Sequence, residues 1–246
     1  MSATRSRSGK KPILNPAALI VSHGQPSDPD PAEAVLAGFA AEVARALPGW
    51  QVGSATLAKP GALEAALADA GPGAHVYPYF MTGGWFTGEA LIERLAGAQA
   101  VVLPPFGHDP GLPGMAAALL SEVMAAQGWQ APEVRVFLAA HGSGRSAQAA
   151  IDSQGFAAAL AAALPVAEVR VGFVEEPPYL ADQARDLGAR AICLPFFAAK
   201  GGHVTEDIPK ALELAGFQGV LLDPIGCAPG AAALVARGLK REPGPA

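Results

Sequence analysis

The chain contains a long internal duplication, and this repeat limits the possible folds more than any other feature of its 246 residues. The segment Ala18–Gln25 matches Val136–Ser143, which places His23 and His141 at equivalent positions. Further matches keep the same order at offsets of 117 to 119 residues: Gly38–Ala41 with Gly155–Ala158, Ala46–Pro48 with Ala163–Pro165, Pro105–Gly107 with Pro224–Gly226, and Pro110–Gly111 with Pro229–Gly230. Constant order and spacing over such a length indicate a duplicated domain.

Each half shows the same alternation of strand and helix patterns. Apolar strand segments are expected over 17–21, 74–80 and 98–103, and in the second half over 136–140, 191–197 and 220–223. The second strand of each half is expected to run into a proline turn, within 51–60 and 168–178. Helical patterns lie between them, over 33–47 and 62–70 and again over 154–164 and 179–187. This alternation is typical of βαβ units, which form a parallel sheet with helices on both faces.

We therefore predict an α/β protein of two similar lobes. Each lobe is expected to be a four-stranded parallel sheet flanked by helices, of flavodoxin-like type, with a cleft between the lobes. The predicted boundaries are a disordered basic tail over 1–14, an N-terminal lobe over 15–130 and a C-terminal lobe over 131–240. Because both lobes lie in one chain, a monomer with an internal pseudo-twofold axis is sufficient.

Composition excludes several classes of partner. Hydrophobic residues make up 51% and charged residues 16% of the chain, so a large core is available. The formal net charge of −5 and the absence of a basic stripe argue against a nucleic-acid partner. No apolar run reaches the length of a membrane span or follows the basic N-terminus as a secretory signal would. Two cysteines without a CxxC spacing fit a reduced cytoplasm, where we expect the protein to reside.

Chemically active residues gather at the strand ends of the second half. Right-handed crossovers place all strand-to-helix turns on one edge of a sheet, where open α/β sheets bind ligands. His141, the Glu175–Glu176 turn and His203 all fall at this edge. Two imidazoles with a carboxylate from Glu175 or Glu176 suit a divalent transition metal such as Co, Ni, Fe or Zn. Their wide spacing in the sequence favours an open, exchanging site over a closed structural zinc site.

The first half lacks most of this set. When 76–85 is aligned with 193–203, Trp85 stands where the second half has His203. His23 remains, and the pattern does not decide whether it is functional. His75 and His108 have no matching neighbours and are expected to be surface or strand-edge residues.

Structural roles for the same histidines are the alternative. His141 would then cap a turn, and His203 would orient a helix start that Thr205 and Asp207 cap. Glu206 and Asp207 are expected to be first-turn acids that favour the helix dipole rather than metal ligands.

Four motifs together resemble the class II chelatases, in particular the CbiX/SirB-type sirohydrochlorin cobaltochelatases and ferrochelatases. They are HGSGR at 141–145, EEPPYL at 175–180, FFAAKGGHVTEDIP at 196–209 and DPIG at 223–226. The resemblance covers the second half closely and the first half only through the duplication. It implies ATP-independent insertion of a divalent metal (Co²⁺, Fe²⁺ or Ni²⁺) as substrate into sirohydrochlorin or a related tetrapyrrole, in cobalamin or sirohaem biosynthesis, with no organic cofactor.

The resemblance also implies roles for individual residues, with one active site per chain. His141 and His203 would be the metal ligands, and His141 would also accept protons from the pyrrole nitrogens. Glu175, or Glu176 if the register shifts by one residue, would contact the substrate; we assign Glu175 to catalysis and Glu176 to substrate contact. Further substrate contacts are expected from Ala198, Ala199, Lys200, Gly201, Gly202, Arg145 and Trp85, and apolar surface for the ring from Tyr79, Phe80, Phe196 and Phe197.

Two other functions remain as alternatives. A histidine phosphatase also has a His-Gly turn, but it needs an arginine directly before the histidine, and here Ser22 and Ala140 occupy those positions. A non-catalytic tetrapyrrole or metal carrier would explain the degenerate first half. The retained pair of His141 and His203 favours catalysis, because holding a polycarboxylate requires no paired imidazoles.

Overall fold

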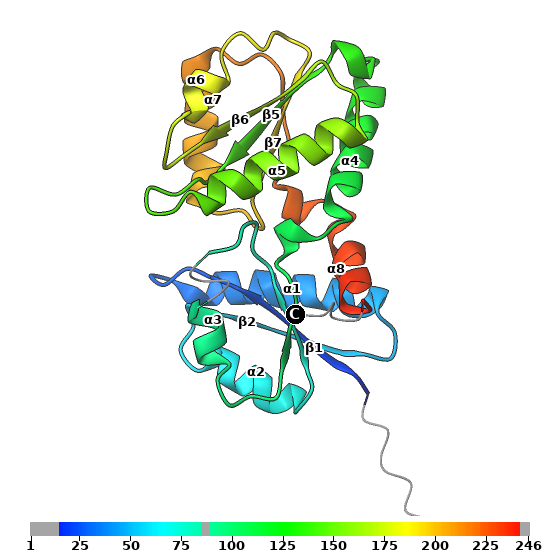
Figure 1. The fold of residues 1–246 in the computed structure, drawn as a ribbon, viewed down its shortest axis with the longest axis vertical. Coiled ribbons are helices and arrows are strands. Elements are labelled where there is room, and N and C mark those ends of the chain that lie inside the picture. The colour runs from blue at the N-terminus through cyan, green and yellow to red at the C-terminus, as the bar shows by residue number, and fades with distance from the viewer. Residues whose placement is uncertain (1–14, 85–88, 242–246) are drawn as a thin grey trace, which may run out of the picture.

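The chain folds into two lobes, each built on its own parallel sheet (Figure 1). The structure is a computed structural model and describes residues 15–84 and 89–241. The first sheet contains β1 (Ala17–Ser22), β2 (Gln51–Thr56), β3 (His75–Pro78) and β4 (Val101–Val102) in the order β2-β1-β3-β4. The second contains β5 (Arg135–Ala140), β6 (Glu168–Phe173), β7 (Ala191–Pro195) and β8 (Val220–Leu221) in the order β6-β5-β7-β8. The predicted fold class is confirmed, and the duplication appears as a repeated strand order.

Helices follow the strands in both lobes. They are α1 (Pro29–Ala46), α2 (Ala62–Ala70), α3 (Glu89–Arg94), α4 (Leu112–Gln127), α5 (Gln148–Ala163), α6 (Leu180–Gln183), α7 (Ile208–Ala215) and α8 (Ala231–Leu239). Shorter turns complete the order: 3₁₀ turns η1 (Phe106–His108), η2 (Ala131–Glu133) and η4 (Ile225–Cys227), and a π-helical turn η3 (His203–Asp207). None of the helices in the described ranges is both long and apolar enough to cross a bilayer.

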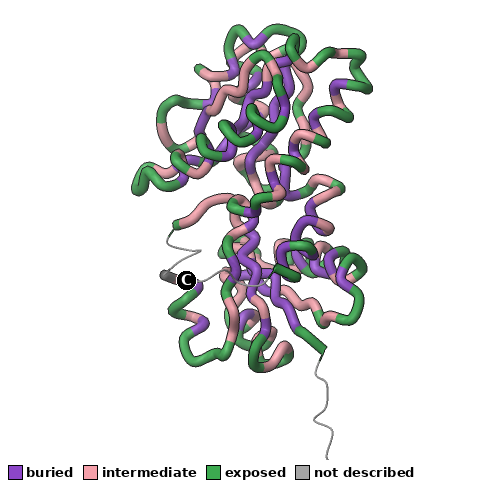
Figure 2. Tube along the Cα trace, turned by 45° about the vertical axis from the view of Figure 1, so that its right-hand side comes forward, coloured by how far each residue is buried: buried purple, intermediate pink, exposed green. Residues whose placement is uncertain are grey.

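Strand side chains alternate between two apolar layers in each lobe. In β5, Leu138 joins a large central cluster that also contains Ile20 of β1, whereas Phe137 packs on the other face with α6 and α7. In β1, Leu19 faces the corresponding outer layer with α2 and α3. Because side chains of a strand point alternately to opposite faces, sheets covered on both sides need apolar residues at successive positions. Buried segments accordingly run through the centres of both lobes (Figure 2).

The last helix of each half packs on the opposite lobe. Helix α8, from the end of the second half, lies against α1 of the first lobe, and α4, from the end of the first half, lies against α5 of the second (Figure 1). Two contacts with the first half hold the end of α8. The Leu239 carbonyl oxygen lies 3.2 Å from Nδ1 of His75, and the Arg241 guanidinium donates to Oδ1 of the buried Asp109 at 3.0 Å. The two lobes therefore share one continuous apolar core.

Some element boundaries differ from the sequence prediction. Helix α5 begins at Gln148, six residues before the predicted start, and α6 ends at Gln183 rather than at Leu187. The domain boundaries at 15–130 and 131–240, and the cleft between the lobes, remain predictions.

Candidate active site

Three neighbouring strands of the second sheet carry the predicted metal-binding residues at their carboxyl ends. Strand β5 lies between β6 and β7, and His141 directly follows β5. Glu175 lies two residues beyond β6, and His203 follows the loop that leaves β7. One ligand atom from each of these three side chains lies within 4.8 Å of the others. The structure thus brings together the residues that the sequence placed at one sheet edge, and all three reach solvent.

The His141 turn depends on a glycine. Gly142 has φ +72°, and a Cβ there would lie 2.9 Å from the Glu176 side chain and from Cβ of Phe173. In this turn Nδ1 of His141 is 2.8 Å from the Gly142 carbonyl oxygen. Because a carbonyl can only accept, Nδ1 carries the proton and Nε2 keeps a free lone pair. His141 is therefore held with Nε2 as its available metal-ligating atom.

The two adjacent glutamates have different roles. The backbone N–H of Glu175 donates to the His141 carbonyl at 3.0 Å, which fixes Glu175 beside that histidine. Glu176 instead accepts the Ser143 N–H at 2.8 Å through Oε1 and so supports the His141 turn. The sequence left open which glutamate joins the histidines, and the geometry selects Glu175. Direct substrate contact by Glu176 remains a prediction.

His203 is the first residue of the π-helical turn η3. Its Nδ1 lies 2.6 Å from Oδ2 of Asp207. The predicted caps are not formed: no side chain caps α7, and the Thr205 hydroxyl donates to the Gly201 carbonyl at 3.2 Å. The reason is that η3 continues directly into α7, so Asp207 is already helical and its carboxylate turns back to the imidazole. The four-residue spacing of His203 and Asp207 is the sequence signal for this pair, which the predicted caps did not include.

One aromatic ring borders both histidines. The His141 and His203 rings meet edge to face, with centroids 4.7 Å apart and planes at 86°. The Phe197 ring lies 6.3 Å from His141 and 6.5 Å from His203 and is partly exposed. The expectation that Phe196 and Tyr79 offer surface to a ligand is wrong, because both side chains are buried in the core.

The loop from Ala198 to Gly202 runs beside these residues. Ala198 is packed on Gly226, while Ala199, Lys200, Gly201 and Gly202 are exposed. Lys200 forms an ion pair of 2.7 Å with Asp223, and this hydrogen bond raises the pKa of the Lys200 ammonium. The predicted substrate contacts of this loop remain predictions.

Two more residues predicted to contact the substrate, Arg145 and Trp85, lie outside this loop. Arg145 is exposed on the loop after β5, and its backbone N–H donates to the Ser143 hydroxyl at 3.2 Å. Trp85 lies outside the described residues.

The first lobe repeats the histidine turn without the rest of the set. Nδ1 of His23 lies 2.9 Å from the Gly24 carbonyl, as in the His141 turn. Lys59, where the second half has a glutamate, forms an ion pair of 3.0 Å with Asp30. Within residues 15–84 and 89–241, the trio of His141, Glu175 and His203 is the only group of three such ligands.

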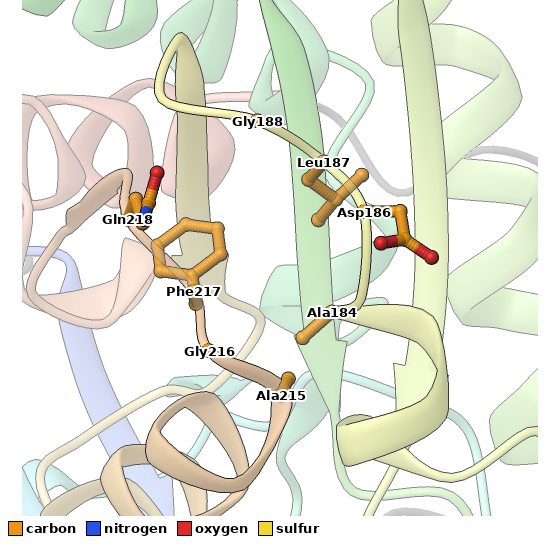
Figure 3. A pocket seen from close by; sticks show the side chains of 8 residues that line it. All are labelled: Ala184, Asp186, Leu187, Gly188, Ala215, Gly216, Phe217 and Gln218. Atoms are coloured by element: carbon orange, nitrogen blue, oxygen red, sulfur yellow. The ribbon is translucent and has the colours of Figure 1, made fainter.

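A hollow lies at the opposite edge of the second sheet. A cavity of about 250 Å³ is lined by residues 184, 186–188 and 215–218, including Leu187 and Phe217, which precede β7 and β8 (Figure 3). A second cavity of about 370 Å³ occupies the corresponding place in the first lobe, between 67–72 and 97–100. Because ligands of open α/β sheets bind beyond the carboxyl ends of the strands, we assign both cavities to the repeated connections between helix and strand rather than to chemistry.

Comparison with solved structures identifies the family. The chain is 48% identical to a protein described as CbiX, the terminal enzyme for biosynthesis of siroheme in denitrifying bacteria, with a TM-score of 0.83 over 91% of this chain and 98% of that one. The chain belongs to the CbiX family. A CbiX family model also matches residues 135–242, the half that carries the histidine pair. The resemblance to class II chelatases of the CbiX/SirB type is thus confirmed.

More distant structures share the fold. SirB from Bacillus subtilis, solved with Fe³⁺, is 19% identical with a TM-score of 0.71 over 92% of this chain and 95% of that one. A sirohydrochlorin chelatase SirB from Bacillus subtilis subspecies spizizenii, solved with cobalt, is 16% identical with a TM-score of 0.64 over 92% and 94%. Among curated proteins, no sequence matches this CbiX-family chain.

Proposed function

We propose that this CbiX-family protein inserts Co²⁺ or Fe²⁺ into sirohydrochlorin or a related tetrapyrrole without ATP. The observation that carries the proposal is the convergence of His141, Glu175 and His203, with ligand atoms within 4.8 Å of one another at an exposed sheet edge. The relative at 48% identity, described as the terminal enzyme of siroheme biosynthesis, supports the same reaction class.

The chemistry requires a metal ion to be delivered while two protons leave. Insertion of M²⁺ replaces two pyrrole N–H protons, so the products are the metallated ring and two H⁺. Imidazole suits Co and Fe, and three protein ligands leave coordination positions open for the pyrrole nitrogens. In this proposal His141 and His203 hold the metal ion through Nε2, and Glu175 accepts one proton. His141 accepts the other at Nε2 once that atom has released the metal ion to the ring. The partly exposed Phe197 ring would support the macrocycle.

Charged groups around the site bear on the recognition of a polycarboxylate. Arg145 is exposed, and the described residues place no carboxylate in an ion pair with it. Lys200 is exposed as well, but Asp223 partly neutralises it. We therefore propose that Arg145 contributes more to binding substrate carboxylates than Lys200 does.

A metal-insertion assay tests the proposal. Purified protein is mixed with sirohydrochlorin and Co²⁺ or Fe²⁺, and insertion is followed by the absorbance change of the ring. We expect strong acceleration by the wild type and loss of activity in His203→Ala. His23→Ala is the matched control, because His23 occupies the same kind of turn in the other lobe, and we expect a smaller effect.

Two outcomes would contradict the proposal. An unchanged rate in His203→Ala would exclude His203 from the reaction. Stoichiometric binding of metal or ring without faster insertion would instead favour the carrier function. The identity of the physiological metal, Co²⁺ or Fe²⁺, would follow from competition between the two ions in the same assay.

A further inference from the structure

We propose that Asp207 is a positioning residue for the metal site: it holds the His203 imidazole in the tautomer and orientation that present Nε2 to the metal ion. This inference rests on the proposed function, because it assumes that His203 is a metal ligand. It assigns a role to a residue that is not one of the three metal-ligating residues.

The contact itself is short and specific. Oδ2 of Asp207 lies 2.6 Å from Nδ1 of His203. A carboxylate in its usual ionised form can only accept, so Nδ1 of a neutral His203 carries the proton and Nε2 is left as the ligating nitrogen. Metal-binding histidines commonly donate their other ring N–H to a carboxylate or a carbonyl, which fixes the ring and raises its basicity.

The pair forms within the π-helical turn η3. The Ile208 N–H bonds to the His203 carbonyl five residues back, which widens the turn relative to an α-helix. His203 and Asp207 are four residues apart, a spacing that places both side chains on the same side of the helical turn. Turns of this kind are rare and often occur at functional sites. Helix capping does not compete for Asp207, since its side chain makes no cap for α7.

The two histidines are supported in different ways. His141 uses the Gly142 carbonyl next to it in the chain, whereas His203 uses a carboxylate. Both contacts engage Nδ1, and the rings meet edge to face. The two free Nε2 atoms can then serve one ion together with Glu175. The partner of His141 is a backbone carbonyl, so no side-chain substitution removes it. The partner of His203 is the Asp207 side chain, which a substitution can remove.

Glu206 provides a matched control for charge. It precedes Asp207 in the same turn and is exposed, and its side chain makes no hydrogen bond or ion pair in the described structure. Neutralising either acid removes one negative charge near the site, but only the loss of Asp207 frees the imidazole. A general electrostatic effect would therefore appear in both variants, and a positioning effect only in one.

The test measures Co²⁺ binding to the purified full-length protein without tetrapyrrole, by calorimetry and by the visible spectrum of bound Co²⁺. We expect Asp207→Ala to weaken Co²⁺ binding by about 10- to 100-fold, the usual range for such supporting residues. Asp207→Asn, whose amide oxygen can still accept from Nδ1–H, should retain most of the affinity and the wild-type spectrum. Glu206→Gln should match the wild type, and thermal unfolding should show that all variants are folded.

The outcomes separate this inference from the proposed function. If the wild type binds Co²⁺ no better than His203→Ala, the metal site itself is wrong. If the wild type binds through His203 and Asp207→Ala binds equally well, only the role of Asp207 is wrong. Equal losses in Asp207→Asn and Asp207→Ala, or a similar loss in Glu206→Gln, would also overturn positioning, because charge alone would then explain the effect.

Discussion

Nε2 of His108 lies 2.9 Å from Oδ2 of Asp152 and links a turn of the first half to helix α5 of the second. The Asp152 carboxylate also accepts the Gly83 N–H and the Gln148 side-chain amide, each at 2.7 Å. Its side chain is only 9% exposed, whereas that of His108 is 38% exposed. His108 is therefore more than the surface or strand-edge residue that the sequence predicted, since it takes part in a junction between the two halves.

Asp152→Ala should destabilise the fold through this junction. The substitution removes the acceptor of the Gly83 N–H, which is partly buried, and of two side chains. Leaving a buried donor unpaired costs about 1–3 kcal/mol, and we expect a loss of that size in the free energy of unfolding measured with urea. Asp182→Ala is the control, because its pair with Arg185 is exposed on both sides and should contribute less than about 1 kcal/mol. Equal effects of the two substitutions would show that Asp152 does not join the halves.

Gly142→Ala should disturb the metal site through the His141 turn. The alanine would have to adopt the φ of +72° found at this position, and its Cβ would lie 2.9 Å from atoms of Glu176 and Phe173. Such backbone strain costs about 1–3 kcal/mol, and we expect a loss of that order in unfolding free energy together with weaker Co²⁺ binding. Gly144→Ala is the matched control, since its Cβ would meet only the Glu175 carbonyl at 3.8 Å. Normal Co²⁺ affinity in Gly142→Ala would contradict the role given to this turn.

Cys227 should react slowly with iodoacetamide at mildly alkaline pH. Partial burial raises the pKa of its thiol, and Asp223 adds to this effect while Lys200 opposes it. A raised pKa leaves a smaller thiolate fraction at a given pH, and only the thiolate reacts. We therefore expect slower alkylation than in an unstructured peptide, and still slower reaction in Lys200→Ala. Cys227→Ser should remove the labelling of folded protein, because Cys193 is buried. Peptide-like rates at Cys227, or faster reaction without Lys200, would refute this account.

The fold could be predicted because the repeat and the alternation of apolar strand and helix patterns can be read directly from the sequence. Residues such as Leu19 and Ile20 are both apolar because a sheet covered on both faces buries successive positions. The exchange of α4 and α8 between the lobes could not be predicted in the same way. The apolar face of α8 is visible in the sequence, but the choice of α1 as its partner depends on long-range packing and on contacts such as Arg241 with Asp109.

The part of the site that could be predicted from the sequence is the part that lies directly after the strands. His141 and His203 could be placed because each follows an apolar strand and because the first half has lost the counterpart of His203. The choice between Glu175 and Glu176 depends on which way adjacent side chains point in a turn, and no sequence pattern settles that. The contact of Asp207 with His203 was obscured by a capping pattern: the sequence indicated a capped helix start, whereas both residues lie in one helical turn.

The most direct test of the metal site is the anomalous scattering of cobalt in crystals of the protein soaked with Co²⁺. The account predicts one strong peak at about 2.1 Å from Nε2 of both His141 and His203, a usual distance for imidazole on such metals, with the Glu175 carboxylate beside it. A peak at His23 instead, or no cobalt between the two histidines, would contradict it.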